Sequence, residues 1–168
     1  MSDDGYILTP RGYAALLQCV EETKKRLNEA IQAKAQAGAG QDDWHDEGYK
    51  LAVTEEMTIR QRLSELMAIL QNAEVVTVAE QNESVQIGNG VVVDYEDGST
   101  TSFILDGYLV VSAPGRVSIG SPVGKAVVGL RVGRRATYRG AKGVRTLTVR
   151  RILLPSEAEK TLQKKEGE

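Results

Sequence analysis

Residues that carry chemistry by themselves are scarce in this sequence. Its 168 residues include one cysteine, Cys19, and one histidine, His45. A lone cysteine cannot form a disulfide within the chain, which suits a reducing compartment, and we expect Cys19 to be a small packing residue. The sequence contains no phosphate-binding glycine loop, no histidine-cysteine metal set and no Ser-His-Asp set. We therefore expect that this chain has no active site of its own and that the protein is not an enzyme.

Long apolar runs are also missing. No run approaches the roughly 20 residues that a membrane-spanning helix needs. The first residues, MSDDGYILTP, lack the positive start and apolar stretch of a signal peptide. We therefore expect a soluble, cytoplasmic protein. The 21 basic and 23 acidic residues nearly cancel to a net charge of -2, so the chain as a whole is not a polybasic nucleic-acid binder.

Two long segments in the first half have the spacing of a coiled coil. Apolar residues recur at alternating steps of three and four from Tyr13 to Ala30 and again from Tyr49 to Leu70, with one polar break at Glu56. Thr9-Pro10 is typical of a helix N-cap followed by proline. A helix from there to about residue 37 is roughly 40 Å long. A short connection makes the two helices an antiparallel hairpin, to which we assign residues 1–78.

After the hairpin the pattern changes to short strands. Strand-like runs occur at 74–78, 91–93, 102–105, 109–111 and 147–149, separated by turn signals such as Asp106-Gly107. Ser121-Pro122 predicts the cap and first turn of one short helix that ends near Gly129. The predicted fold class is therefore α+β, in which a small, mostly antiparallel β-sheet domain with one short helix occupies residues 79–155. Residues 156–168 are expected to form a charged flexible tail that frays or folds into a loose helix.

The connection between the two helices is strongly acidic. Residues 42–47 read Asp-Asp-Trp-His-Asp-Glu. Carboxylates this close repel one another, and the end of a long hairpin cannot bury them against the same chain. We expect them to reach a divalent metal ion held by a partner, because hard oxygen ligands suit such ions. The predicted metal ligands are Asp42, Asp43, Asp46 and Glu47.

Trp44 and His45 lie among these carboxylates and are the predicted contacts of the hairpin end with a partner. Trp44 either folds back over the hairpin end to cover Leu51 or Val53, or packs against partner loops or a nucleotide base. His45 is either a solvated loop residue without a role or a group whose protonation weakens the repulsion at the acidic end. The sequence leaves both pairs of alternatives open.

Two local motifs flank the hairpin in a characteristic order. They are Leu8-Thr9-x-x-Gly12-Tyr13 and Ser121-Pro122-x-Gly124-Lys125-Ala126-x-x-Gly129. Together with the acidic hairpin end, they resemble the GreA/GreB family of transcription factors, and the resemblance extends from about residue 8 to residue 152. The small sheet domain also resembles the FKBP-like architecture of peptidyl-prolyl isomerases.

The resemblance implies a protein that acts on bacterial RNA polymerase. Members of the family dock through the sheet domain, and the corresponding docking residues here are Ser121, Pro122, Gly124 and Lys125. They insert the hairpin into the secondary channel of the polymerase, where the acidic end shares the catalytic Mg²⁺ of that enzyme. Nascent RNA or DNA would be contacted only indirectly, and no membrane is involved.

The acidic end departs from the cleavage-stimulating members of the family. Asp42 falls at the family's aspartate, but His45 falls at its glutamate, and imidazole is a poorer Mg²⁺ ligand than a carboxylate. The run from Asp42 to Gly48 instead resembles the inhibitory homologues, which occupy the same channel without promoting cleavage. We therefore expect inhibition or pausing of elongation, with stimulation of transcript cleavage as the alternative.

Two functions from other classes are less consistent with the sequence. A peptidyl-prolyl isomerase needs an aromatic-lined pocket, and Phe103 is the only phenylalanine. A structural coiled-coil adaptor would leave the acidic hairpin end unexplained. The arginines from Arg131 to Arg151 could form a docking or nucleic-acid face, but strand alternation favours plain exposure to solvent, except around Ser121-Pro122.

Overall fold

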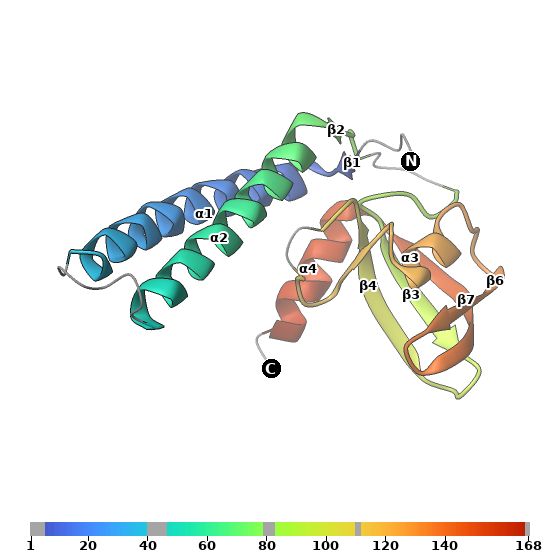
Figure 1. Cartoon of the computed structure of the whole chain (residues 1–168). Helices are drawn as coiled ribbons and strands as arrows, with labels where there is room; N and C mark the ends of the chain where they lie inside the picture. The colour runs from blue at the N-terminus through green and yellow to red at the C-terminus, as the bar shows by residue number, and fades with distance from the viewer. Residues whose placement is uncertain (1–5, 40–46, 79–82, 110–111, 167–168) are drawn as a thin grey trace. The chain divides into compact units, whose positions relative to one another are not determined.

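The computed structural model describes residues 6–39, 47–78, 83–109 and 112–166, and its side chains up to residue 161. The chain divides into two compact units (Figure 1). One unit is Ala14–Ala73, and the other combines Met1–Tyr13 with Glu74–Glu168. The predicted fold class, a helical hairpin with a small antiparallel sheet domain, is confirmed. The finer boundary between residues 78 and 79 stays a prediction.

The helical unit is the expected hairpin of α1 (Pro10–Ala37) and α2 (Glu47–Gln71). Thr9 caps α1 as predicted, because its Oγ1 accepts a hydrogen bond of 3.0 Å from the Gly12 backbone N–H. Most of the buried seam lies at the heptad positions that the spacing predicts, namely Leu16, Val20, Ala30 and Leu66. The last turn differs, because Ile69 is buried where the repeat predicts Leu70, which is half-buried.

The polar break in the second heptad pattern is explained by charge pairing. Glu56 is only 7% exposed although it is ionisable. Its carboxylate pairs with Lys34 from α1 and with Arg60 one turn further along α2. Hydrogen bonding to Lys34 and then to Arg60 lowers the pKa of Glu56. A charged residue is therefore tolerated at a seam position because both of its oxygens are paired.

The sheet unit contains a five-stranded sheet in the order β5-β4-β3-β7-β6. Its strands are β3 (Gly90–Tyr95), β4 (Thr100–Asp106), β5 (Arg116–Ser118), β6 (Arg135–Gly140) and β7 (Gly143–Leu153). All neighbouring pairs are antiparallel except β4 and β5, which are parallel. Two further short strands, β1 (Tyr6–Leu8) and β2 (Ala73–Val75), pair with each other. The strand predicted at 109–111 is not found at Leu109, and residues 110–111 lie outside the described part.

The two faces of the five-stranded sheet differ in composition. One face, called the inner face, packs into an apolar core that includes Val91, Phe103, Leu147 and Val149. Helix α3 (Pro122–Val127) contributes Val127 to the same core. On the opposite, outer face the helix α4 (Pro155–Glu166) lies against β3 and β4. Of the two alternatives expected for the tail at 156–168, fraying or a loose helix, the structure therefore shows a helix.

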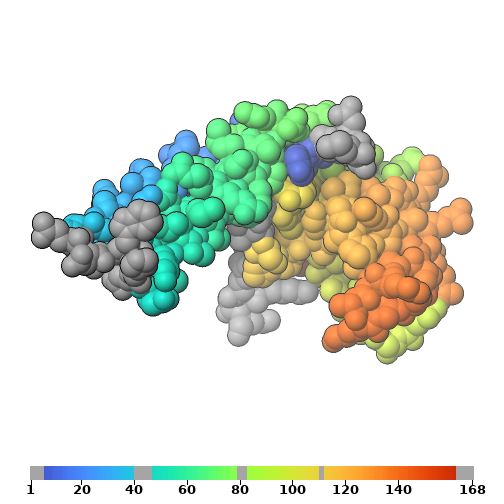
Figure 2. All heavy atoms as spheres, in the orientation of Figure 1, coloured from blue at the N-terminus to red at the C-terminus, as the bar shows by residue number. Residues whose placement is uncertain are grey.

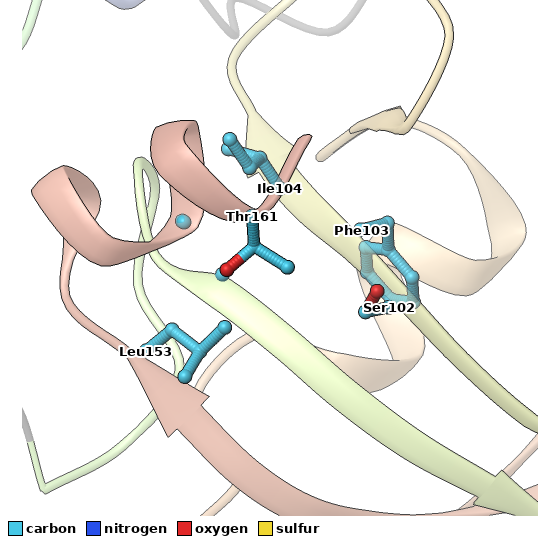
Figure 3. A pocket seen from close by; sticks show the side chains of 7 residues that line it. Ser102, Phe103, Ile104, Leu153 and Thr161 are labelled. Atoms are coloured by element: carbon cyan, nitrogen blue, oxygen red, sulfur yellow. The ribbon is translucent and has the colours of Figure 1, made fainter. Parts of the chain in front are cut away.

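Helix α4 covers only one end of the outer face. Its Ala158 packs with Ile104 and Leu153, and these three side chains are nearly fully buried. Figure 3 shows Ile104, Leu153 and Thr161 at this end of the outer face, where they line a small cavity. The cavity holds about 10 Å³, the space of a single water molecule, so it is not a ligand site.

Candidate functional site

The predicted metal-binding end of the hairpin falls almost wholly outside the described residues. Asp42, Asp43, Trp44, His45 and Asp46 belong to the segment 40–46, whose structure is not described, so their roles stay predictions. In the part of the chain that is described, no group of three or more His, Cys, Asp or Glu side chains is placed to hold a metal ion.

Glu47 is the one predicted metal ligand that can be located. It is the first residue of α2, and its side chain is 91% exposed. Lys50, one turn along the helix, places its Nζ 3.2 Å from the Glu47 carboxylate. An ion pair this exposed contributes little to stability, so the carboxylate stays available to a stronger cation.

The predicted docking residues lie together at the start of α3. Ser121 caps this helix, because its Oγ accepts a hydrogen bond of 3.0 Å from the Gly124 N–H. The same hydroxyl donates to the Ser118 carbonyl at 2.7 Å. Pro122 occupies the first turn, where its missing N–H is not needed. These bonds hold the loop in one conformation before any partner binds.

Gly124 is the residue that allows the loop to close. A Cβ at this position would lie 2.1 Å from the Ser118 carbonyl oxygen, which is far inside van der Waals contact. Gly124 is also buried, so the chain has no room to move away. The glycine in the Ser-Pro-x-Gly motif is thus required by the close approach of two backbone segments.

Beside this loop lies an apolar hollow of about 430 Å³. It is lined by Tyr6, Ile7, Tyr108, Ile119, Gly120, Lys125 and Val128. The rings of Tyr6 and Tyr108 meet edge to face with centroids 4.8 Å apart, which fixes one wall. Lys125 provides the only charge of the lining, at its rim. Such a surface can take an apolar side chain with an acidic neighbour.

The sequence analysis missed a buried charge network below the start of α1. Asp106 accepts hydrogen bonds from the Thr9 hydroxyl at 2.7 Å and from Arg116 at 2.8 Å. Arg116, whose side chain is 5% exposed, also pairs with Glu159 of α4. Asp106-Gly107 was interpreted as a turn signal only. The one signal available was an ionisable residue at the end of an apolar strand, where burial demands a partner.

Tyr95 and Tyr138 form a second polar contact at the core of the sheet unit. Their hydroxyl oxygens are 3.4 Å apart, and Arg145 lies 4.0 Å above the Tyr95 ring. Burial and the neighbouring hydroxyl raise the pKa of Tyr95 to about 12. A phenol held neutral in this way cannot act as a base near neutral pH.

The described residues thus define an α+β protein with a long helical hairpin and a sheet unit that carries an apolar hollow. Comparisons with known proteins refine this class. Residues 6–75 match the family described as "Transcription elongation factor, N-terminal". Residues 80–154 match "Transcription elongation factor, GreA/GreB, C-term". The chain belongs to the GreA/GreB family of transcription elongation factors.

Individual relatives include an inhibitor and an elongation factor. The chain is 33% identical over 148 residues to the transcription inhibitor protein Gfh1 of Thermus thermophilus, across 84% of this chain and 93% of that one. It is 29% identical over 153 residues to the transcription elongation factor GreA of Roseiflexus sp., across 89% and 98%. A crystal structure of Gfh1 from Thermus thermophilus matches 89% of this chain and 99% of its own, with 29% identity and a TM-score of 0.44.

None of the helices formed by the described residues is long and apolar enough to cross a bilayer.

Proposed function

We propose that this protein binds bacterial RNA polymerase and inhibits or pauses transcript elongation. The observation that carries the proposal is the 33% identity with an inhibitor, Gfh1, along nearly its whole length. In this proposal the sheet unit docks through the loop at Ser121 and the adjoining hollow. The helical hairpin then enters the secondary channel.

The acidic segment supplies the chemistry at the end of the hairpin. Asp42, Asp43, Asp46 and Glu47 offer carboxylate oxygens, which are the ligands that Mg²⁺ prefers. The catalytic Mg²⁺ belongs to the polymerase, so these residues need not form a metal site alone. Carboxylates that draw on this ion compete with the phosphates of an incoming nucleotide, which slows extension.

The exposure of Glu47 supports this role. Its carboxylate projects from the first turn of α2, and its one ionic partner among the described residues is an exposed lysine. Exchange of that weak pair for a divalent cation gains a stronger electrostatic interaction. Lys50 would then be released to solvent at little cost.

A transcription assay tests both the effect and its sign. Purified core polymerase is stalled in a backtracked complex, and labelled transcripts are followed with and without the protein. We expect slower extension and no new 3′ fragments. The triple variant Asp42→Asn/Asp43→Asn/Asp46→Asn should lose the slowing. The control Glu55→Gln, an exposed change on α2, should keep it.

Three results would contradict the proposal in different ways. Shortened transcripts would show cleavage stimulation, the second candidate, which the 29% identity with GreA favours. Full inhibition by the triple variant would remove the acidic end from the mechanism. If the protein has no effect on polymerase, both candidate functions, inhibition of elongation and stimulation of cleavage, are wrong.

A further inference from the structure

The basic residues of this chain are strongly segregated along the sequence. Between Gly107 and Ser156 there are ten lysines and arginines and no aspartate or glutamate. The net charge of the whole chain is nearly neutral, but this region of the chain is basic. Such an uneven distribution of charge indicates interaction with a polyanion.

The sheet directs several of these residues to one side. In β6, Ala136 and Tyr138 pack against the core, so the alternating residues Arg135, Thr137 and Arg139 lie on the outer face. Thr146 and Thr148 of β7 are paired opposite Thr137 and Arg135, and therefore share that face. The hydroxyls of Thr137 and Thr146 are 3.1 Å apart.

Two more arginines extend the same surface toward α4. Arg151 is paired with Val92, a residue that packs under α4 on the outer face. Arg150, at the register shift, lies 3.6 Å from Asp94. We call this set the basic face: Arg135, Thr137, Arg139, Thr148, Arg150 and Arg151. In Figure 2 the orange atoms of the β6–β7 hairpin form an open part of the surface.

Much of this charge is not neutralised within the protein. Arg139 and Arg151 have no ionic partner among the described residues, and Arg134 and Lys142, beside the same strands, have none there either. Arg135 and Arg150 do pair, with Glu96 at 3.1 Å and with Asp94 at 3.6 Å. Both pairs are well exposed, so they hold their partners weakly and can exchange them.

We propose that the basic face binds the phosphate backbone of nucleic acid, without reading its sequence. Arginine and threonine side chains are typical phosphate contacts. The side chains that point to this face include no aromatic residue, because Tyr138 points to the core, so bases have nothing to stack on. Four residues of strand separate Arg135 from Arg139, about 14 Å at the usual rise. Measured along the axis of a DNA duplex, where each strand carries a charge about every 3.4 Å, that distance covers about four phosphates of one strand.

A regular polyanion fits this face better than a folded acidic protein. The cations lie on the neighbouring strands β6 and β7, and a nucleic-acid strand presents a continuous row of charges that can reach both strands. The inference is independent of the proposed role of the hairpin, because none of its residues belongs to the helical unit or to the loop at Ser121.

The test is a salt titration of binding by the full chain, without polymerase. Fluorescence anisotropy follows a labelled single-stranded RNA and a labelled DNA duplex, each of about 20 nucleotides or base pairs, between about 50 and 200 mM salt. Three or four phosphate contacts predict a slope of log K against log salt of about -2 to -3 on the single strand. The two probes show which kind of nucleic acid the face prefers.

Charge reversal on the face supplies the decisive variant. Arg139→Glu/Arg151→Glu should weaken binding and reduce the magnitude of the slope by about 1.4, or about 0.7 for each lost contact. Lys25→Glu/Arg62→Glu makes the same change of net charge on exposed positions of α1 and α2 and should bind as the unchanged chain does. Thermal unfolding confirms that both variants are folded.

Three outcomes would overturn the inference. One is the absence of binding by the unchanged chain to either probe at about 50 mM salt. Another is equal weakening by the helical control, which would assign the effect to net charge. The third is an unchanged slope in the Arg139→Glu/Arg151→Glu variant, which would place the contacts elsewhere.

Discussion

At individual positions, the clearest consequence concerns the buried pair of Asp106 and Arg116. Replacement of Arg116 by alanine leaves the Asp106 carboxylate buried, 2% exposed, with only the Thr9 hydroxyl and the Gly107 N–H as donors. Removal of one partner from a buried pair costs about 3–5 kcal/mol. We therefore expect Arg116→Ala to lower the free energy of unfolding by that amount, as measured by urea denaturation.

An exposed pair provides the matched control for that measurement. Arg131 lies 3.5 Å from Glu83, and both side chains are more than two-thirds exposed, at 69% and 87%. Arg131→Ala should cost less than about 1 kcal/mol. Similar losses in the two variants would mean that the buried network does not stabilise the sheet unit.

How far single residues could be predicted depends on how local their partners are. Thr9, Ser121 and Pro122 were placed correctly, because a helix cap is decided within three or four residues. The role of Arg116 as the partner of buried Asp106 was not predicted, because it depends on the parallel pairing of β4 with β5. Pairing of that kind is set by the tertiary fold rather than by nearby sequence.

Among the secondary-structure elements, the hairpin was easier to predict than the sheet. The seam of α1 and α2 follows directly from a repeat of three and four. In the sheet unit, by contrast, an apolar run at 109–111 predicted a strand that Leu109 does not join, while β6 was missed. Its alternate positions are arginine and threonine, so β6 carries only half of the usual apolar signal.

Glu56 makes the stability of the hairpin depend on pH. Pairing with Lys34, and then with Arg60, lowers the pKa of Glu56 from 4.5 in the folded state. The unfolded chain therefore binds this proton more readily, so the stabilisation is present above about pH 4.5 and is lost as the pH falls through the folded pKa. We expect the midpoint of thermal unfolding to fall as the pH is lowered through this range.

A comparison with Glu56→Gln isolates this contribution from that of other carboxylates. The variant should be less stable than the unchanged chain at neutral pH, since Lys34 loses its carboxylate partner. The difference between the two thermal midpoints should then narrow below pH 4.5, the ordinary pKa of glutamate. Parallel curves down to lower pH would show that the pair is not formed in solution.

For the protein as a whole, the densest acidic cluster and the densest basic cluster lie in different units. The acidic cluster of residues 42–47 belongs to the helical unit, and the ten cations between Gly107 and Ser156 belong to the sheet unit. Two such clusters on separate units can bind different partners without competing for one surface. In a factor of this family, docking and the action of the acidic end should therefore be separable by mutation.

Lys125 allows this separation to be measured. It is exposed at the rim of the apolar hollow and makes no ion pair among the described residues, so Lys125→Glu should fold normally. If a partner supplies an acidic group there, the reversal should weaken polymerase binding while the acidic end stays intact. We expect inhibition to return at higher protein concentration, with the same maximum. A reduced maximum instead would mean that Lys125 takes part in inhibition itself, and an unchanged affinity would remove the hollow from the docking surface.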